Sequence, residues 1–93
     1  MRILIVEDDL EASEVMAKGL TEAAHDCVTA PDGEAGLATA RKGDFDVMIV
    51  DRMMPRLDGL SMVEILRGEG DATPVLFLSA LGLNNQGDVA WGL

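Results

Sequence analysis

Three acidic residues follow two apolar runs of this sequence and together could do phosphoryl-transfer chemistry. Residues 3–6 lead into Glu7 and Asp8, and residues 47–50 lead into Asp51. If both runs are buried parallel strands, their carboxyl ends meet at one edge of the sheet and bring the three carboxylates together. A divalent cation is then needed to hold these negative charges side by side. The spacing therefore indicates a cation-dependent site for a phosphoryl group.

The elements that must position these acids can be predicted from apolar periodicity. We expect strands at residues 2–6, 25–30, 45–50 and 75–78, and helices at residues 9–24, 34–42 and 60–68. Asp58 and Gly59 are expected to form the turn that enters the last helix. Strands that alternate with helices in this way form parallel sheets whose ligands bind at the carboxyl ends of the strands. The sequence therefore predicts an α/β fold with a doubly wound parallel sheet, and Ser79 falls at the same edge as the three acids.

Length and composition indicate one small globular domain without repeats or linkers. The 93 residues are 48% hydrophobic and 26% charged, as in ordinary globular proteins. No apolar run is long enough to span a membrane, and no secretory pattern precedes the first strand, so we expect a cytoplasmic protein with no membrane partner. The single cysteine, Cys27, has no partner for an internal disulfide and is expected to be a small core residue.

The charge of the chain limits its partners. Seventeen acidic and seven basic residues give a formal net charge of -10. Nucleic-acid binding requires clustered Lys and Arg to neutralise phosphates, so direct binding to nucleic acid is disfavoured. We expect the partner to be a protein or a cation.

Three segments carry a resemblance to a known family. They are RILIVEDD at residues 2–9, VMIVDRMMPRLDG at residues 47–59 and PVLFLSA at residues 74–80. In this order they resemble the receiver domain of bacterial two-component response regulators, and the similarity extends over residues 1–82. The resemblance implies a flavodoxin-like sheet with strand order 2-1-3-4. It also implies a phosphoacceptor domain rather than an enzyme, capable at most of self-phosphorylation and autodephosphorylation.

The resemblance assigns a role to each candidate residue. Asp51 matches the phosphoacceptor, which takes a phosphoryl group from the phosphohistidine of a sensor histidine kinase. Glu7 and Asp8 match the acidic pair that binds Mg²⁺ together with Asp51, and the backbone carbonyl of Met53 matches a further ligand. Mg²⁺ prefers such oxygen ligands and keeps several waters. Ser79 matches the switch hydroxyl that bonds a phosphoryl oxygen.

Each of these residues also has a purely structural interpretation. Asp51 could be an ordinary acid at the end of a strand, and Ser79 a turn residue. Glu7 and Asp8 could complement the dipole of the following helix. For Asp9 we prefer this structural role, as the N-cap of that helix.

The sequence also departs from the family pattern. A receiver domain continues through a fourth helix, a fifth strand ending in lysine and a fifth helix, whereas residues 83–93 are only a short tail with a possible start of the fourth helix. Lys18 and Lys42 are the only lysines, and neither is expected at a strand end. We therefore expect a receiver truncated after its fourth strand, with impaired phosphorylation because the phosphate-binding lysine is missing.

The same departure predicts self-association and leaves alternatives open. A fourth strand without a neighbour exposes an unpaired edge and an apolar face, which a homodimer would cover. The main alternative is a non-phosphorylated interaction or dimerisation fragment in which the acidic cluster has no chemical role. A phosphatase-like hydrolase with an aspartyl nucleophile is disfavoured, because such enzymes need a second acid where this sequence has Met53.

Overall fold

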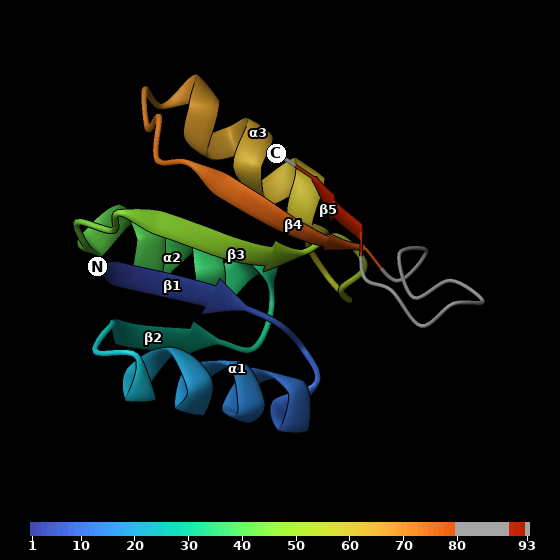
Figure 1. Ribbon diagram of the computed structural model, residues 1–93. Helices are drawn as coiled ribbons and strands as arrows, with labels where there is room; N and C mark the ends of the chain where they lie inside the picture. The colour runs from blue at the N-terminus through green and yellow to red at the C-terminus, as the bar shows by residue number, and fades with distance from the viewer. Residues whose placement is uncertain (80–89, 93) are drawn as a thin grey trace.

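The computed structural model describes residues 1–79 and 90–92 of the chain as alternating strands and helices (Figure 1). The elements are β1 (Arg2–Val6), α1 (Leu10–Glu22), β2 (Asp26–Ala30), α2 (Gly33–Lys42), β3 (Val47–Asp51), α3 (Gly59–Gly68), β4 (Val75–Ser79) and β5 (Ala90–Gly92). The first seven match the predicted strands and helices, with ends that differ by a few residues. In particular, β3 extends to Asp51 itself, so the backbone of this residue belongs to the strand.

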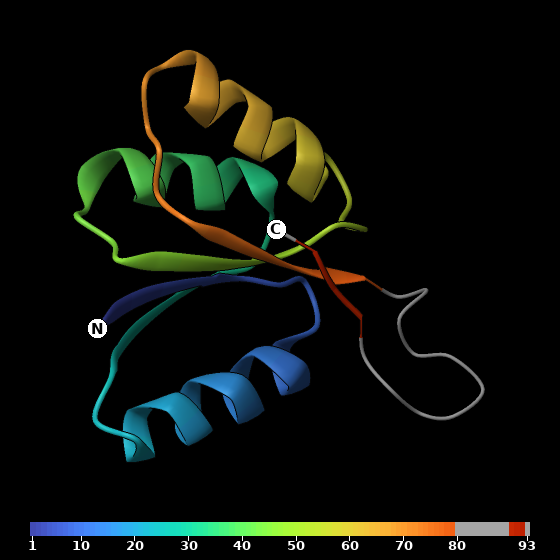
Figure 2. The same ribbon diagram turned by 45° about the horizontal axis from the view of Figure 1, so that its top comes forward.

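The sheet has the strand order β2-β1-β3-β4-β5, and its first four strands are parallel. Helices α2 and α3 cover one face while α1 covers the other, as Figures 1 and 2 show from two directions. The predicted doubly wound, flavodoxin-like order 2-1-3-4 is therefore confirmed. Since β1 and β3 are neighbours, with Val6 opposite Val50, the residues that follow these two strands come out side by side.

The fifth strand differs from the sequence-based expectation. Ala90–Gly92 form a short antiparallel strand on β4, in which Ala90 lies opposite Ser79 and Gly92 opposite Phe77, where a loop or a helical turn was expected. Residues 83–89 and 93 of the predicted tail lie outside the described residues. The expectation of a completely unpaired β4 edge is thus corrected over three residues, because free N–H and C=O groups of an edge strand readily pair with another extended segment.

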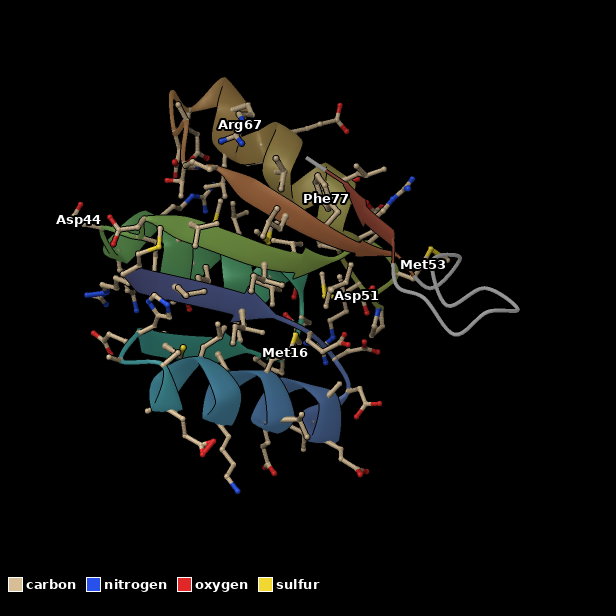
Figure 3. All side chains as sticks on the ribbon, viewed as in Figure 1. Met16, Asp44, Asp51, Met53, Arg67 and Phe77 are labelled. Atoms are coloured by element: carbon tan, nitrogen blue, oxygen red, sulfur yellow. The ribbon has the colours of Figure 1, made fainter. Side chains whose placement is uncertain are left out.

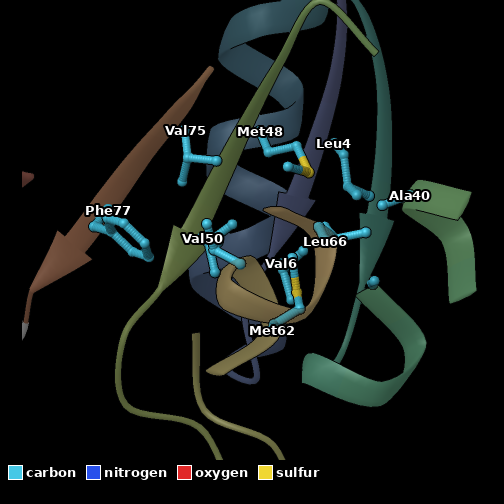
Figure 4. Packing of buried hydrophobic residues seen from close by; sticks show 11 residues of the cluster. Leu4, Val6, Ala40, Met48, Val50, Met62, Leu66, Val75 and Phe77 are labelled. Atoms are coloured by element: carbon cyan, nitrogen blue, oxygen red, sulfur yellow. The ribbon is translucent and has the colours of Figure 1, made fainter. Parts of the chain in front are cut away.

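The core has two layers because β1 and β3 are buried on both faces. Leu4, Val6, Met48 and Val50 point to one side and pack with residues of α2, α3 and β4 (Figure 4). Ile3, Ile5 and Ile49 point to the other side, against α1. Alternate residues of a strand face opposite ways, so a strand between two helical layers is apolar throughout. This burial explains the continuous apolar runs and anchors β1 and β3 in the core.

Local capping sets the direction of the first helix. The side chain of Asp9 accepts hydrogen bonds from the backbone N–H groups of Glu11, at 3.0 Å, and Ala12, at 3.2 Å. The predicted N-cap role of Asp9 is therefore confirmed. Cys27 is half-buried and packs beside the α1 side of the core. Within residues 1–79 and 90–92, no helix has the length and apolar character needed to cross a membrane.

Candidate functional site

The structure brings together the three acids that the strand ends predicted to converge. Glu7 and Asp8 follow β1, and Asp51 is the last residue of β3. One carboxylate oxygen from each lies within 4.8 Å of the other two. Figure 3 shows Asp51 and Met53 at the arrowhead end of the strands, whereas Asp44 lies at the opposite end. The adjacency of parallel strands β1 and β3 is sufficient to create this cluster.

Glu7 is the buried member of the cluster, with 8% of its surface exposed. Burial, then the hydrogen bond and negative charge of Asp51, and then those of Asp8 together raise the pKa of its carboxyl group from a usual value near 4.5 to about 8. The backbone N–H of Asp8 donates to Glu7 Oε2 at 3.0 Å. Without a cation, Glu7 therefore retains its proton at neutral pH, which reduces repulsion within the cluster.

Asp51 is held by its own loop. The backbone N–H of Met53 donates to Asp51 Oδ1 at 3.1 Å, and the N–H of Arg52 donates to the Leu78 carbonyl oxygen of β4 at 3.0 Å. A Cβ atom at Gly59 would collide with the carbonyl oxygen of Asp51. Only glycine lets α3 begin so close to the end of β3. The carboxylate is half-buried, so it remains accessible from solvent.

The β3–α3 loop, residues 52–58, ends in a helix cap that takes no part in the acidic cluster. Asp58 Oδ1 accepts the backbone N–H of Ser61 at 2.8 Å, and the Ser61 hydroxyl donates to Asp58 Oδ2 at 3.0 Å. These hydrogen bonds lower the pKa of the Asp58 carboxyl group. The interpretation of Asp58 and Gly59 as turn and helix entry is confirmed.

The remaining candidates lie around the cluster. Ser79 is the last residue of β4, the strand next to β3, and so reaches the same edge of the sheet. Met53 follows Asp51 by two residues and is 70% exposed. Lys18 lies in α1 and Lys42 ends α2, so both are away from the carboxyl ends of the strands, as expected.

No basic side chain balances the cluster within the part of the chain that the structure describes. The ion pairs found there join Arg41 to Glu69 and Arg56 to Asp32 and Glu34. Three carboxylates without an adjacent cationic side chain form a set of hard oxygen donors, which suits Mg²⁺ or Ca²⁺. The donor chemistry therefore fits the metal that the sequence predicted.

Gly33 is a neighbour of the β3–α3 loop that no sequence pattern predicted. A Cβ atom at this position would collide with the Leu57 carbonyl oxygen. The sequence showed only a turn before a helix at this point. No local pattern reveals the contact, because 24 residues separate its partners and the packing of α2 beside α3 creates it.

The comparisons with known proteins agree with this geometry. The family model described as "Response regulator receiver domain" matches residues 3–90. A probable transcriptional regulatory protein, SilR of Salmonella typhimurium, is 43% identical over 82 residues, which are 88% of this chain and 36% of SilR. The chain thus spans about a third of the length of the curated relatives it matches.

Solved structures show the same fold. The receiver domain of a Francisella response regulator superposes with a TM-score of 0.84 at 34% identity, covering 91% of this chain and 69% of that domain. The response regulator TrrA of Thermotoga maritima, solved in complex with Mg²⁺-BeF, gives a TM-score of 0.82 at 28% identity, covering 91% of this chain and 74% of TrrA.

Proposed function

This chain belongs to the response regulator receiver domain family, and on that premise we propose that it accepts a phosphoryl group on Asp51 in two-component signalling. The convergence of Glu7, Asp8 and Asp51 at the carboxyl edge of the sheet is the observation that carries the proposal. The donor is the phosphohistidine of a sensor histidine kinase, which is the proposed partner and acts with the chain in the cytoplasm. The chain serves as a phosphoacceptor, and its own catalysis is limited to self-phosphorylation and autodephosphorylation.

The transfer step uses one oxygen of Asp51 as the nucleophile. The N–H of Met53 occupies Oδ1, so Oδ2 is the atom that attacks phosphorus. A new P–O bond forms while the P–N bond of the phosphohistidine breaks, and the electron pair of that bond stays on the imidazole nitrogen of the kinase. The product is an aspartyl phosphate. The hydrogen bond from Met53 keeps the attacking oxygen pointed at the donor throughout this displacement.

The residues that would hold Mg²⁺ are Glu7, Asp8, Asp51 and the backbone carbonyl of Met53. When bound, the ion supplies positive charge that offsets repulsion between the carboxylates and the incoming phosphoryl oxygens. Glu7 must release its proton to join this set as an anion, which it does more readily beside a dication. The Mg²⁺-BeF complex of TrrA, a relative at 28% identity, supports the assignment.

Ser79 and the lysines determine how well the phosphoryl group is held. We assign Ser79 to the hydroxyl that donates to a phosphoryl oxygen, because β4 ends at the same edge as β3. Neither Lys18 nor Lys42 lies at that edge. The 93 residues therefore offer no lysine to the phosphoryl oxygens, and we expect slow phosphorylation or a short-lived product.

Intact-mass analysis tests the proposal directly. The chain is incubated with Mg²⁺ and acetyl phosphate, and Asp51→Asn is treated in parallel. We expect a phosphoryl adduct on the parent chain and none on Asp51→Asn. Asp58→Asn is the matched control, because this acid caps α3 and should leave the adduct unchanged. An adduct of equal yield on Asp51→Asn, or none on the parent chain even after rapid quenching, would contradict the proposal.

Self-association is a second part of the proposal. Strand β5 pairs with Phe77–Ser79, and among the described residues the first two residues of β4 have no partner on that side. Leu76 and Leu78 on the neighbouring face are half-buried. We propose that two copies associate through this edge and face as a homodimer. Light scattering over a concentration series measures the association, and a constant monomer mass at high concentration would exclude it.

A further inference from the structure

The β3–α3 loop rests on the first turn of α2, and two glycines on one face of this helix make the contact possible. Gly33 and Gly36 are both buried and lie three residues apart, so they face the same way. A Cβ at Gly36 would approach Val6 Cγ1 to 2.8 Å and Met62 Sδ to 2.9 Å. The helix is therefore seated tightly on β1 and α3 and has little room to move.

Gly33 touches the loop instead of the core. A Cβ there would collide with the Leu57 carbonyl oxygen and would lie 2.8 Å from the Leu57 carbonyl carbon. These are backbone atoms, which cannot rotate aside as the end of a side chain can. An added methyl group at Gly33 is therefore expected to displace the loop, whereas one at Gly36 meets side-chain atoms of Val6 and Met62, which can adjust.

Polar contacts flank the same junction. Arg56 has a backbone φ of 70°, a left-handed conformation that is costly for a residue with a side chain. Its guanidinium Nη1 lies 3.9 Å from Asp32 Oδ2 and 3.8 Å from Glu34 Oε2. Asp32 in turn caps α2 by accepting the N–H of Ala35 at 2.8 Å. The strained residue thus faces the cap of the helix that supports the loop.

The loop transmits this support to the acidic site at both of its ends. At its start, the Met53 N–H holds Asp51 Oδ1 at 3.1 Å. At its end, the Gly59 N–H donates to the Arg52 carbonyl oxygen at 3.2 Å. Leu57 and Met54 pack against the core between these two points. The loop is short, so a displacement at Leu57 must shift Met53 or Gly59.

We propose that Gly33 is a positioning residue for the phosphoacceptor site, because its missing side chain lets the start of α2 hold the β3–α3 loop against Asp51. Arg56 contributes to the same support through Asp32 and Glu34. The inference rests on the proposed function for its effect on phosphorylation. It also makes a structural claim about the loop that holds whether or not Asp51 is phosphorylated.

Matched glycine substitutions test the proposal. Gly33→Ala, Gly36→Ala and Gly19→Ala all place a methyl group in a helix, but against the loop, against the core and in open space respectively. The initial phosphorylation rate with Mg²⁺ and acetyl phosphate is measured beside thermal stability. Because misplacement on the order of 1 Å can cost a hundredfold in rate, we expect Gly33→Ala to be at least tenfold slower. Gly36→Ala should lose stability with a rate within threefold of the parent. Gly19→Ala should leave the rate unchanged and raise the stability, because alanine is the better helix former.

A second readout separates this inference from the proposed function. The amide resonances of Met53 and Gly59 are recorded by NMR in metal-free protein. Gly33→Ala should shift both resonances, whereas Gly36→Ala should leave them near their parent positions. If the parent chain forms no phosphoryl adduct, the proposed function fails. The expected pattern of amide shifts would still show that Gly33 positions the loop. Unchanged resonances in Gly33→Ala, or equal rate losses in Gly33→Ala and Gly36→Ala, would overturn it.

Arg56 variants provide the test if Gly33→Ala does not fold. Arg56→Asn keeps a residue type that tolerates the left-handed backbone, while Arg56→Asp adds repulsion toward Asp32 and Glu34. We expect Arg56→Asp to shift the Met53 amide and slow phosphorylation two- to threefold relative to Arg56→Asn. Equal rates and equal Met53 shifts in the two variants would overturn the proposed support by α2.

Discussion

At the carboxyl end of the sheet the acidic cluster has no basic partner among the described residues, whereas at the amino end Glu69 and Asp71 have ionic or hydrogen-bond partners. At the carboxyl end, burial and the nearby Asp51 raise the pKa of Glu7 to about 8. At the amino end, Arg41 lowers the pKa of Glu69, and hydrogen bonds from Thr73 lower the pKa of Asp71. The charged carboxylate of Glu7 is thus disfavoured at one end, whereas those of Glu69 and Asp71 are favoured at the other.

At the amino end, Arg2 makes further contacts with the loop before β3. Asp46 Oδ2 accepts the backbone N–H of Arg2 at 2.7 Å, and the Arg2 guanidinium lies 4.8 Å from the centre of the Phe45 ring. Such contacts join the start of β1 to the loop before β3 and strengthen the fold. The contrast indicates that one end of the sheet serves stability. The other end retains unfavourable charge that a ligand can relieve, which is typical of functional sites.

The largest expected effect is stabilisation by Mg²⁺, which should depend on acids at the carboxyl end of the sheet and not on those at the amino end. We expect Mg²⁺ at one hundred times its dissociation constant to raise the free energy of unfolding by about 2.7 kcal/mol. Asp8→Asn should remove most of this gain, because Asp8 belongs to the acidic cluster. Thermal unfolding with and without Mg²⁺ measures it. Asp44→Asn, at the opposite end (Figure 3), is the control, and an equal gain in Asp8→Asn and the parent would argue against a metal site here.

Without metal, the free energy of unfolding should depend on pH through the titration of Glu7. Because its folded-state pKa is raised from about 4.5 to about 8, protonated Glu7 favours folding. Its contribution is complete below pH 4.5 and is lost as the pH rises through 8. Glu7→Gln should remove this loss, which we expect to be at least about 1.4 kcal/mol, the equivalent of one pKa unit. Urea unfolding between pH 5 and 9 checks the prediction, and parallel profiles for Glu7→Gln and the parent would contradict it.

Asp71 should show the opposite dependence on pH. Its carboxylate accepts the Thr73 hydroxyl at 2.6 Å and the Thr73 N–H at 2.9 Å, so its folded pKa is lowered. The resulting stability is present above its usual pKa and is lost as the pH falls through the lower folded value. Asp71→Asn should cost about 1 kcal/mol at pH 7 and less in acid. Urea unfolding at pH 7 and pH 3 measures the difference, and a cost that grew in acid would refute the assignment.

Removing the exposed ion pair of Arg41 and Glu69 should change stability the least. The two side chains are 49% and 40% exposed, so water and salt screen their attraction. Arg41→Ala should lower the melting temperature less than any change above, and about 0.5 M NaCl should reduce the difference further. Its response to Mg²⁺ should equal that of the parent chain. A larger loss than that of Asp71→Asn would show that the pair has a structural role beyond an exposed ion pair.

Most of the sheet and the acidic cluster could be predicted because each depends on short patterns. Strand β1 is apolar on both faces and ends in Glu7 and Asp8, and β3 ends in Asp51, so strand order alone brings the acids together. The strand at Ala90–Gly92 could not be predicted. It has no alternating pattern of its own and forms where β4 offers unpaired backbone groups.

By itself, the sequence determined which residues can do chemistry at this site and which elements carry them. Periodicity and strand-end acids are local properties, and parallel strands bring such acids to one edge whatever the details of packing. Only the tertiary structure decided how strongly the acids interact and what supports them. The raised pKa of Glu7 depends on burial by distant residues, and the contact of Gly33 with Leu57 depends on how α2 sits on the core. Burial and close approach arise from packing between segments remote in the chain, so no local pattern contains them.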